Sequence, residues 1–324
     1  PLVRAKALVA AGDLAFYQDD FDREEILGHE SLSLFRELGD KHGTAAALDL
    51  LGGTAWMRNA YVAARSSYEE ANALFQQVGD DWGRARCLQV VARVCCAQGE
   101  YAQASALLEE SLEIYQLLGD KKRISWGFFL LSRVLFISQS DAVEACTLAQ
   151  RSLELSQELG DKSGLAYALG PLGELLAQQG NTERARALTE ESVIIFKELG
   201  DRSGTAEALL SLAHVATAQK DLVAARTFYE ECLAILKTVG NKELLAACLE
   251  GLGEVLVAQS DPARAIRLWG MASVLREEIN APLPPVYQVS YEQAKAKVRT
   301  QEGEAIFMAV WNQGQSMPLE HLFL

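Results

Sequence analysis

The tripeptide Leu38-Gly39-Asp40 decides how this chain folds, because it returns along the sequence at a nearly constant interval. Its glycines follow one another every 40 or 41 residues, and Asn280 takes the next position in the series. The copies are LGD at 38–40, VGD at 78–80, LGD at 118–120, 159–161 and 199–201, VGN at 239–241 and INA at 279–281. Such self-similarity indicates a stack of structural repeats.

Each copy is expected to end one helix and begin the next. Glycine adopts the left-handed conformation at a helix end without steric cost, and asparagine is the next best residue there. The Asp or Asn that follows can accept hydrogen bonds from the free N–H groups of the next helix. A second set of polar turns lies halfway between the copies, at 98–104, 139–145, 179–185, 219–225 and 259–265. Each repeat is therefore predicted to contain two antiparallel helices of about 16–18 residues.

Small residues recur where the two helices of a repeat would cross, and a small side chain lets two backbones approach closely. In the first helix of each repeat they are Gly12, Gly52, Ala92, Ser132, Gly173, Ala213 and Gly253. In the second helix they are Ala64, Ala104, Ala145, Ala185, Ala225 and Ala265, with Glu24 as the exception in the first repeat. Seven positions later come Ser31, Ala71, Ser111, Ser152, Ser192, Cys232 and Ala272.

This spacing of small residues resembles the tetratricopeptide repeat, over about residues 2–279. The resemblance implies an all-α fold, a right-handed α-solenoid of seven helix-turn-helix repeats. The long interval, compared with the usual ~34 residues, is that of the Leu-Gly-Asn scaffold proteins and of the sensor domain of MalT-like bacterial regulators. The expected repeats are 1–39, 40–79, 80–119, 120–160, 161–200, 201–240 and 241–281.

Residues 282–324 break the interval and are expected to form capping helices, at 286–300 and 302–317, that cover the last apolar face of the array. The stretches 265–270, 282–285 and 311–320 are similar to the end of large bacterial signal-transduction ATPases. In those proteins a nucleotide-binding module precedes a repeat domain, and a winged-helix or LuxR-type DNA-binding domain is often attached. This resemblance implies that the chain is the repeat region of such an ATPase or transcriptional regulator. Since the first residue is Pro1 and not an initiator Met, we expect the chain to be a fragment or a processed form.

The composition argues against binding to nucleic acid or to a membrane. Asp plus Glu number 44 against 30 for Lys plus Arg, a net charge of −14, and such a surface repels phosphate backbones and anionic lipid. The most apolar run, 124–137, is too short to span a bilayer and contains Arg133. Six cysteines without a CxxC pair favour reduced thiols in a cytoplasmic protein.

No pattern in the sequence points to catalysis. There is no GxxxxGK[ST] motif for nucleotide phosphates, and the four histidines are far apart without metal-ligand spacing. Paired carboxylates such as Glu190-Glu191 recur in register along the second helices, which indicates a solvated face rather than an acid–base pair. We expect neither enzyme activity, nor a cofactor, nor a bound metal.

The first helix of each repeat is expected to line a concave groove. Positions around the small crossing residue give this groove aromatic and arginine side chains in the N-terminal half and acidic ones in the C-terminal half. The predicted groove residues are Trp56, Arg86, Gln89, Arg93, Trp126, Phe129, Arg133, Phe136, Tyr167, Glu174, Glu207, His214, Glu250 and Glu254. The charge difference would orient a peptide or partner helix. The alternative is that several of the aromatic residues pack between neighbouring repeats.

The function expected from these features is that of an interaction and effector-sensing domain. It would bind a peptide, a protein partner or a small effector, and it would act on other modules of the same full-length chain. A ligand-free scaffold or oligomerisation arm is the alternative, and a standalone enzyme is the remaining hypothesis. The first helices have no Asn at the positions of the clamp that binds chaperone tails, so such tails are not the expected ligand.

Overall fold

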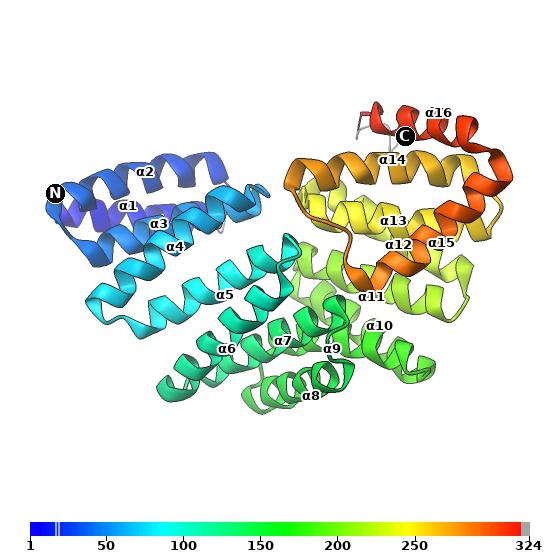
Figure 1. The fold of residues 1–324 in the computed structure, drawn as a ribbon. Helices are drawn as coiled ribbons and strands as arrows, with labels where there is room; N and C mark the ends of the chain where they lie inside the picture. Colours follow the sequence, from blue (N-terminus) through cyan, green and yellow to red (C-terminus); the bar gives the residue numbers. More distant parts are fainter. Residues whose placement is uncertain (17, 19, 319–324) are drawn as a thin grey trace. The chain divides into compact units, whose positions relative to one another are not determined.

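The computed structural model describes residues 1–16, 18 and 20–318, and this part of the chain is built of α-helices joined by short turns (Figure 1). The sixteen helices within it are α1 Leu2–Phe16, α2 Phe21–Leu38, α3 Lys41–Met57, α4 Tyr61–Val78, α5 Asp81–Ala97, α6 Tyr101–Leu118, α7 Lys121–Ser138, α8 Ala142–Leu159, α9 Lys162–Gln178, α10 Thr182–Leu199, α11 Arg202–Ala218, α12 Leu222–Val239, α13 Lys242–Ala258, α14 Pro262–Ile279, α15 Pro285–Glu302 and α16 Glu304–Gln315. The chain therefore has the all-α fold that the repeat pattern predicts.

The contacts divide the chain into two compact units, residues 1–127 and 128–324, with α7 running across the boundary. Within the first unit, α3 packs against α4 and α5 against α6. Within the second, α9 packs against α10, α11 against α12 and α13 against α14. Successive pairs also contact each other, since α4 packs on α5 and α9 on α11. Each unit is thus a stack of helical hairpins, as expected of a solenoid of repeats.

The predicted turn chemistry is confirmed at the repeated tripeptide. Its six glycines have φ between 63° and 74°, the left-handed conformation that ends a helix. The Asp201 side chain accepts a 2.8 Å hydrogen bond from the backbone N–H of Gly204, and equivalent bonds begin α3, α5 and α9. The halfway turns are less uniform. Aspartates cap α8, α12 and α14, whereas Glu100 and Asn181 do not cap α6 and α10; the Glu100 carboxylate accepts a hydrogen bond from Arg65 instead.

The predicted helix crossings are confirmed as well. The alanines of the second helices, among them Ala104 and Ala185, are 0 % exposed. A Cβ atom added to Gly173 would lie 3.0 Å from the carbonyl oxygen of Ala185, so α9 and α10 cross backbone to backbone. At three of the small positions seven residues later, the side chain also forms a hydrogen bond. It donates a hydrogen bond to a first-helix carbonyl 26 residues earlier, in Ser111–Ala85, Ser192–Ala166 and Cys232–Ala206.

Glu24 stands where the other repeats have a crossing alanine, and it is 1 % exposed in α2. Burial raises the pKa of its carboxyl group from an ordinary 4.5 to about 7. The folded chain therefore binds this proton more tightly than the unfolded chain does. Its contribution to stability is fully present below pH 4.5 and is lost as the pH rises through about 7.

Replacing Glu24 with glutamine is expected to make the protein more stable than the wild type at pH 8, by about 1–3 kcal/mol. The amide keeps the shape of the side chain and removes the cost of ionising it in a buried place. At pH 4.5 this advantage should disappear. Urea unfolding at the two pH values measures the difference. Glu37→Gln, on an exposed position of the same helix, is the control. An equal effect of Glu24→Gln at both pH values would contradict the prediction.

The two predicted tail helices are present as α15 and α16, and α16 packs on α14. Two glycines meet at this contact, Gly270 of α14 and Gly314 of α16. A Cβ atom added to Gly314 would lie 2.9 Å from the Cα atom of Arg267, closer than real side chains approach a backbone. Of the tail stretch that runs to residue 320, Leu319 and Glu320 lie outside the described residues.

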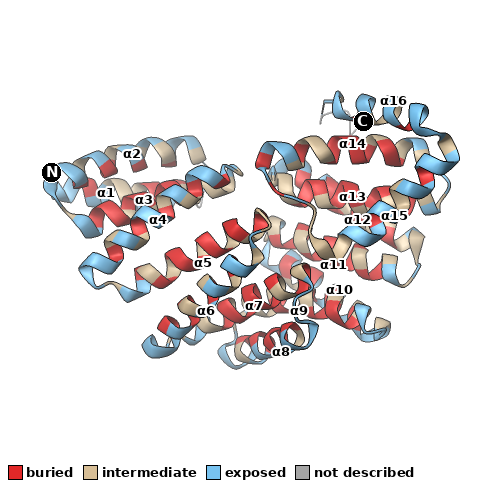
Figure 2. Ribbon diagram, viewed as in Figure 1, coloured by how far each residue is buried: buried red, intermediate tan, exposed pale blue. Residues whose placement is uncertain are grey.

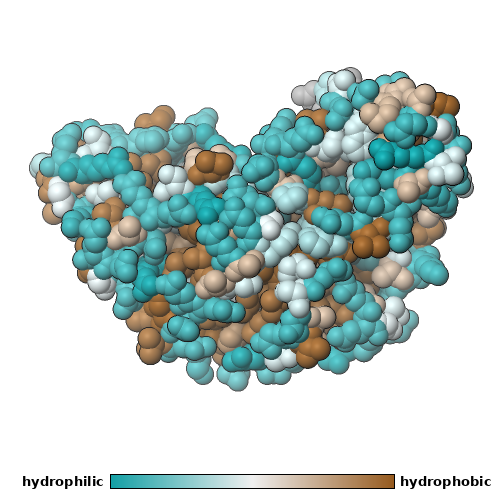
Figure 3. All heavy atoms as spheres, viewed as in Figure 1, coloured by the Kyte–Doolittle hydropathy of each residue, from teal (hydrophilic) through white to brown (hydrophobic). Residues whose placement is uncertain are grey.

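Buried residues follow the facing sides of paired helices, as in α13 and α14, whereas α15 and α16 are mostly exposed or half-buried (Figure 2). Hydrophilic residues cover most of the face seen in Figure 3, with hydrophobic ones scattered among them. Within the described ranges, no helix combines the length and the apolar character needed to cross a membrane.

Candidate functional site

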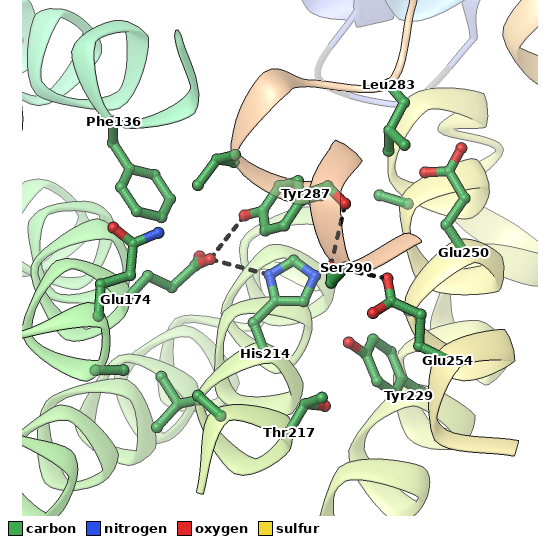
Figure 4. A pocket seen from close by; sticks show the side chains of 17 residues that line it. Phe136, Glu174, His214, Thr217, Tyr229, Glu250, Glu254, Leu283, Tyr287 and Ser290 are labelled. Atoms are coloured by element: carbon green, nitrogen blue, oxygen red, sulfur yellow. Dashed lines mark hydrogen bonds and ion pairs between the residues drawn. The ribbon is translucent and has the colours of Figure 1, made fainter. Parts of the chain in front are cut away.

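A cavity of about 250 Å³ lies in the second unit, between the first helices of three successive repeats and the tail helix α15 (Figure 4). Glu174 of α9, His214 of α11, Glu254 of α13 and Tyr287 of α15 line it, with Glu174 and Glu254 on opposite sides of His214. The first three residues occupy the same position in their repeats, one residue after the small crossing residue. Because α9 contacts α11 and α11 contacts α13, equivalent positions come together in space.

Glu174 is the centre of a hydrogen-bond network that joins three helices. Its Oε2 atom accepts a 2.7 Å hydrogen bond from the Tyr287 hydroxyl, which comes from a residue 113 positions later in the chain. The same oxygen lies 3.0 Å from His214 Nδ1, and Oε1 accepts a 2.6 Å bond from the Ser211 hydroxyl. The ring centroids of His214 and Tyr287 are 4.5 Å apart. The tail helix is therefore attached to the repeats by a specific polar contact.

These contacts keep Glu174 ionised inside the protein. Burial acts to raise the pKa of its carboxyl group, but His214 and the hydrogen bonds from Ser211 and Tyr287 outweigh burial and hold the pKa below its ordinary value. An ionised carboxylate can only accept hydrogen bonds, so the hydrogen on the His214 ring is assigned to Nδ1. The network is thus a fixed wall of the cavity.

Two further carboxylates on α13 face the cavity, one helical turn apart. Glu250 is 5 % exposed and accepts two hydrogen bonds from the Arg276 guanidinium of α14, of 3.0 and 2.8 Å. Glu254 accepts one bond of 3.4 Å from the Ser290 hydroxyl of α15. Burial raises the pKa of the Glu254 carboxyl group to about 7, although Ser290 and His214 act to lower it. The two acids therefore differ sharply in how well their charges are balanced.

A smaller cavity of about 80 Å³ adjoins the first and shares Phe136, Glu174, His214 and Tyr287 with it. Arg133 of α7 and Glu207 of α11 form an ion pair at its edge, with 2.5 Å between Arg133 Nη1 and Glu207 Oε1. Tyr167 and Pro171 of α9 also line it. The two cavities together form a mixed apolar and polar surface along the first helices of the second unit.

The structure therefore brings together all six groove residues that were predicted in the C-terminal half of the chain, and two of those predicted in the N-terminal half. Those that line one or both cavities are Arg133, Phe136, Tyr167, Glu174, Glu207, His214, Glu250 and Glu254. Phe129 does not belong with them as an open contact, because it is 3 % exposed and packs 5.4 Å from the ring of Tyr167. Phe129 therefore packs between neighbouring repeats, which is the alternative stated for the aromatic residues.

The predicted residues of the first unit lie in a different setting. The Arg93 guanidinium is 4.4 Å from the centre of the Trp56 ring, and Trp126 is half-buried in α7. Gln89 is 2 % exposed and donates a 3.5 Å hydrogen bond to the Arg123 carbonyl, so its expected place on an open surface is wrong.

The predicted separation of charge also needs correction. Arg86 forms an ion pair with Asp49 within the first unit, and Arg133 is paired with Glu207 within the second. These two arginines are balanced by nearby acids, because side chains from neighbouring first helices meet in space. The arginines of one half and the acids of the other are therefore not the two ends of a simple dipole.

Among the lining residues that sequence reasoning missed are Tyr229, Tyr287 and Ser290. Tyr229 belongs to a second helix, α12, which was expected to face away from the binding surface. Tyr287 and Ser290 lie on α15, which was predicted only as a cap. The one available signal was the PLPP stretch at 282–285. It indicates that the helix ends there, but it does not indicate the surface on which the next helix packs.

In the part of the chain that the structure describes, no group of three or more His, Cys, Asp or Glu side chains is arranged to hold a metal ion. The cavity offers apolar walls, aromatic rings and a few fixed polar groups, the combination found in binding pockets.

The family model that matches this chain is the tetratricopeptide repeat, at residues 61–117 and 204–269. The first match covers α4 to α6, and the second begins in α11 and ends in α14. No curated protein matches the chain in sequence.

Several solved structures are similar in fold. The Rap conjugation gene regulator of the plasmid pLS20, in complex with the Phr* peptide, has a TM-score of 0.69 and 14 % identity, covering 84 % of this chain and 73 % of that one. NprR in complex with its cognate peptide NprX has a TM-score of 0.66 and 15 % identity, covering 97 % and 88 %. The apo form of RapI has a TM-score of 0.68 and 14 % identity, covering 85 % and 98 %. At such identities the likeness shows the fold, which is that of a tetratricopeptide-like helical repeat protein.

Proposed function

We propose that this chain is a non-catalytic peptide- or protein-binding domain, and that it senses its ligand on the first helices of the second unit. The cavity of about 250 Å³ is the observation on which this proposal rests. Its walls come from consecutive repeats, and the side chains of Glu174, His214 and Tyr287 are already fixed by hydrogen bonds before any ligand arrives. Preorganised groups of this kind lower the cost of binding.

Two of the structures with a similar fold are complexes with peptides, Phr* in one and NprX in the other. This supports a peptide as the ligand here. The tail stretches that are similar to bacterial signal-transduction ATPases support a place in such an ATPase or in a transcriptional regulator. In that setting the bound peptide would change how this domain contacts the other modules of the same chain, in the cytoplasm.

We also propose that Trp56, Arg93 and Trp126 of the first unit form a second contact surface for a protein partner. Tryptophan and arginine are the side chains most enriched in energetic hot spots of interfaces. The Arg93 guanidinium lies over the Trp56 ring and both side chains are half-buried, so little conformational entropy remains to be lost on binding.

Replacing Ala247 with phenylalanine is expected to weaken peptide binding at least tenfold. Ala247 lies on α13 and lines both cavities, so the larger ring would fill the space that a ligand side chain needs. The ligand for this test is a peptide selected from a displayed random library on the wild-type protein, and its affinity is measured by fluorescence anisotropy. Ala187→Phe, on an exposed position of α10, is the matched control.

If the Ala247→Phe protein keeps its helical circular dichroism and binds the selected peptide as the wild type does, the cavity is not the peptide site. If the wild-type protein selects no peptide at all, the ligand-free scaffold becomes the better description of the chain.

A further inference from the structure

The charges that line the larger cavity are unequal. Seventeen residues line it within the described part of the chain; three of them are glutamates and none is a lysine or an arginine. Their carboxylates come from α9 and α13, so they approach the cavity from two sides (Figure 4). A ligand that adds positive charge here would be attracted, and one that adds negative charge would be repelled.

Two of the three carboxylates already have strong partners. Glu250 accepts both of its hydrogen bonds from the Arg276 guanidinium, and Glu174 accepts hydrogen bonds from Ser211 and Tyr287 and contacts His214. These groups are not available to compensate a new charge without breaking an existing contact.

Glu254 is different. Among the described residues its hydrogen-bond partner is the Ser290 hydroxyl, at 3.4 Å, which is at the weak limit of such a bond. A neutral hydroxyl at that distance does little to balance a half-buried carboxylate. The next carboxylate on the same helix, Glu250, adds like charge one turn away. A cation placed in the cavity would therefore complete an ion pair that the protein leaves unfinished.

The remaining walls define what must carry that cation. Phe136, Val215, Leu283 and Val286 are apolar, and the Tyr287 ring closes one side. The volume of about 250 Å³ is below the ~300–1,000 Å³ of sites that hold drug-sized ligands. It suits one side chain or one small amine, with an apolar stem against the walls and a charged end at Glu254.

We propose that this cavity binds an organic cation on an apolar stem, with the Glu254 carboxylate as its counter-ion. The cation is a lysine or arginine side chain of a bound peptide or a free alkylamine; the peptide source rests on the function proposed above. Aromatic rings beside the carboxylate add to the attraction for a cation. The Ser290 hydroxyl is displaced from Glu254 or shares it with the ligand.

The proposal includes a dependence on pH. The titratable groups that face Glu254 are His214 on α11, Tyr229 on α12, Glu250 on its own helix and Tyr291 on α15. Both tyrosines stay neutral, because burial raises their pKa. In the free protein, Glu254 loses its proton as the pH rises through about 7, and the cation binds the ionised form. Affinity is therefore expected to rise several-fold between pH 6 and pH 8.

The first arm of the test uses n-hexylammonium, with n-hexanol as its uncharged counterpart, in isothermal titration calorimetry at pH 8. The wild-type protein is expected to bind n-hexylammonium at least tenfold more tightly than n-hexanol, and Glu254→Gln is expected to abolish that preference. Glu191→Gln, on an exposed position of α10, is expected to bind as the wild type does. Ser290→Ala, which leaves the carboxylate in place, should keep or strengthen the preference.

Equal binding of the two probes by the wild type, or a preference that survives Glu254→Gln, would overturn the cation site. The second arm compares peptides selected on the wild type, each with its basic residues changed to norleucine or glutamine. If replacing the basic residue weakens binding to the wild type but not to the Glu254→Gln protein, the peptide is the source of the cation. Peptides that bind without basic residues, together with a negative first arm, would leave the peptide-binding function standing and reject the cation. Amine binding without any selected peptide would support the cavity for free amines and reject the peptide function.

Discussion

Replacing Arg276 with methionine is expected to lower the free energy of unfolding by about 3–5 kcal/mol. Arg276 of α14 and Glu250 of α13 form a bidentate pair whose side chains are 11 % and 7 % exposed. Methionine fills much of the same volume, so the main loss is the counter-charge. The Glu250 carboxylate would then remain buried without the guanidinium that balances it, which is the costly state.

The same two helices supply the control for this measurement. Lys242 of α13 and Glu278 of α14 form an ion pair of 2.7 Å, but their side chains are 39 % and 48 % exposed. Lys242→Met is therefore expected to cost no more than about 1 kcal/mol. Combining Arg276→Met with Glu250→Leu should recover part of the lost stability, since no buried charge then remains. Similar urea midpoints for Arg276→Met and Lys242→Met would show that burial of the pair does not matter.

Adding a single methyl group at Gly314 is expected to separate α16 from α14. In Gly314→Ala the new Cβ atom would meet the Arg267 backbone, including its Cα atom at 2.9 Å, and a backbone cannot rotate away as a side chain does. The expected cost is about 1–3 kcal/mol. Faster amide hydrogen exchange confined to α16 and to the facing side of α14 would be the direct sign of this separation.

Gly53→Ala is the comparison for Gly314→Ala, because Gly53 is also inside a helix, α3. A Cβ atom there would lie 3.6 Å from the Tyr68 hydroxyl oxygen, an ordinary contact. Alanine also favours the helix more than glycine does, so this variant should be as stable as the wild type or up to about 1 kcal/mol more stable. If both substitutions raise the melting temperature, the close contact of α14 with α16 is not present in solution.

Both of these large effects fall on the last hairpin and its cap, which also supply part of the candidate site. Glu250 and Glu254 lie one turn apart on α13, so the contact with Arg276 helps to set the orientation of the helix that presents Glu254. α15 contacts α13 and is joined to α9 and α11 through Tyr287. Binding at the cavity and packing of the tail are therefore expected to influence each other.

The helical hairpins could be predicted from the sequence because their causes are local. Gly200 ends a helix by adopting φ near 70°, and the Asp201 carboxylate begins the next by accepting a hydrogen bond from the N–H three residues later. Both effects act within one turn of the chain. The small residues at each crossing act within one repeat, and the interval of 40 or 41 residues multiplies a short-range signal seven times. The same periodicity put Glu174, His214 and Glu254 at equivalent positions, which is why they were expected on one surface.

The contacts that only the tertiary structure decided involve either the tail helices, which do not follow the repeat interval, or side chains from different repeats. Tyr287 reaches Glu174 across 113 residues because α15 turns back over the first helices, and no repeated pattern describes a helix that occurs once. The contacts of Arg133 with Glu207 and of Gly314 with the Arg267 backbone could likewise not be predicted from the sequence, since each joins two different helices. Local rules specify how a hairpin closes. The cavity forms where helices from distant parts of the chain pack against one another, and their side-chain packing and charges, which depend on the three-dimensional arrangement, determine its shape.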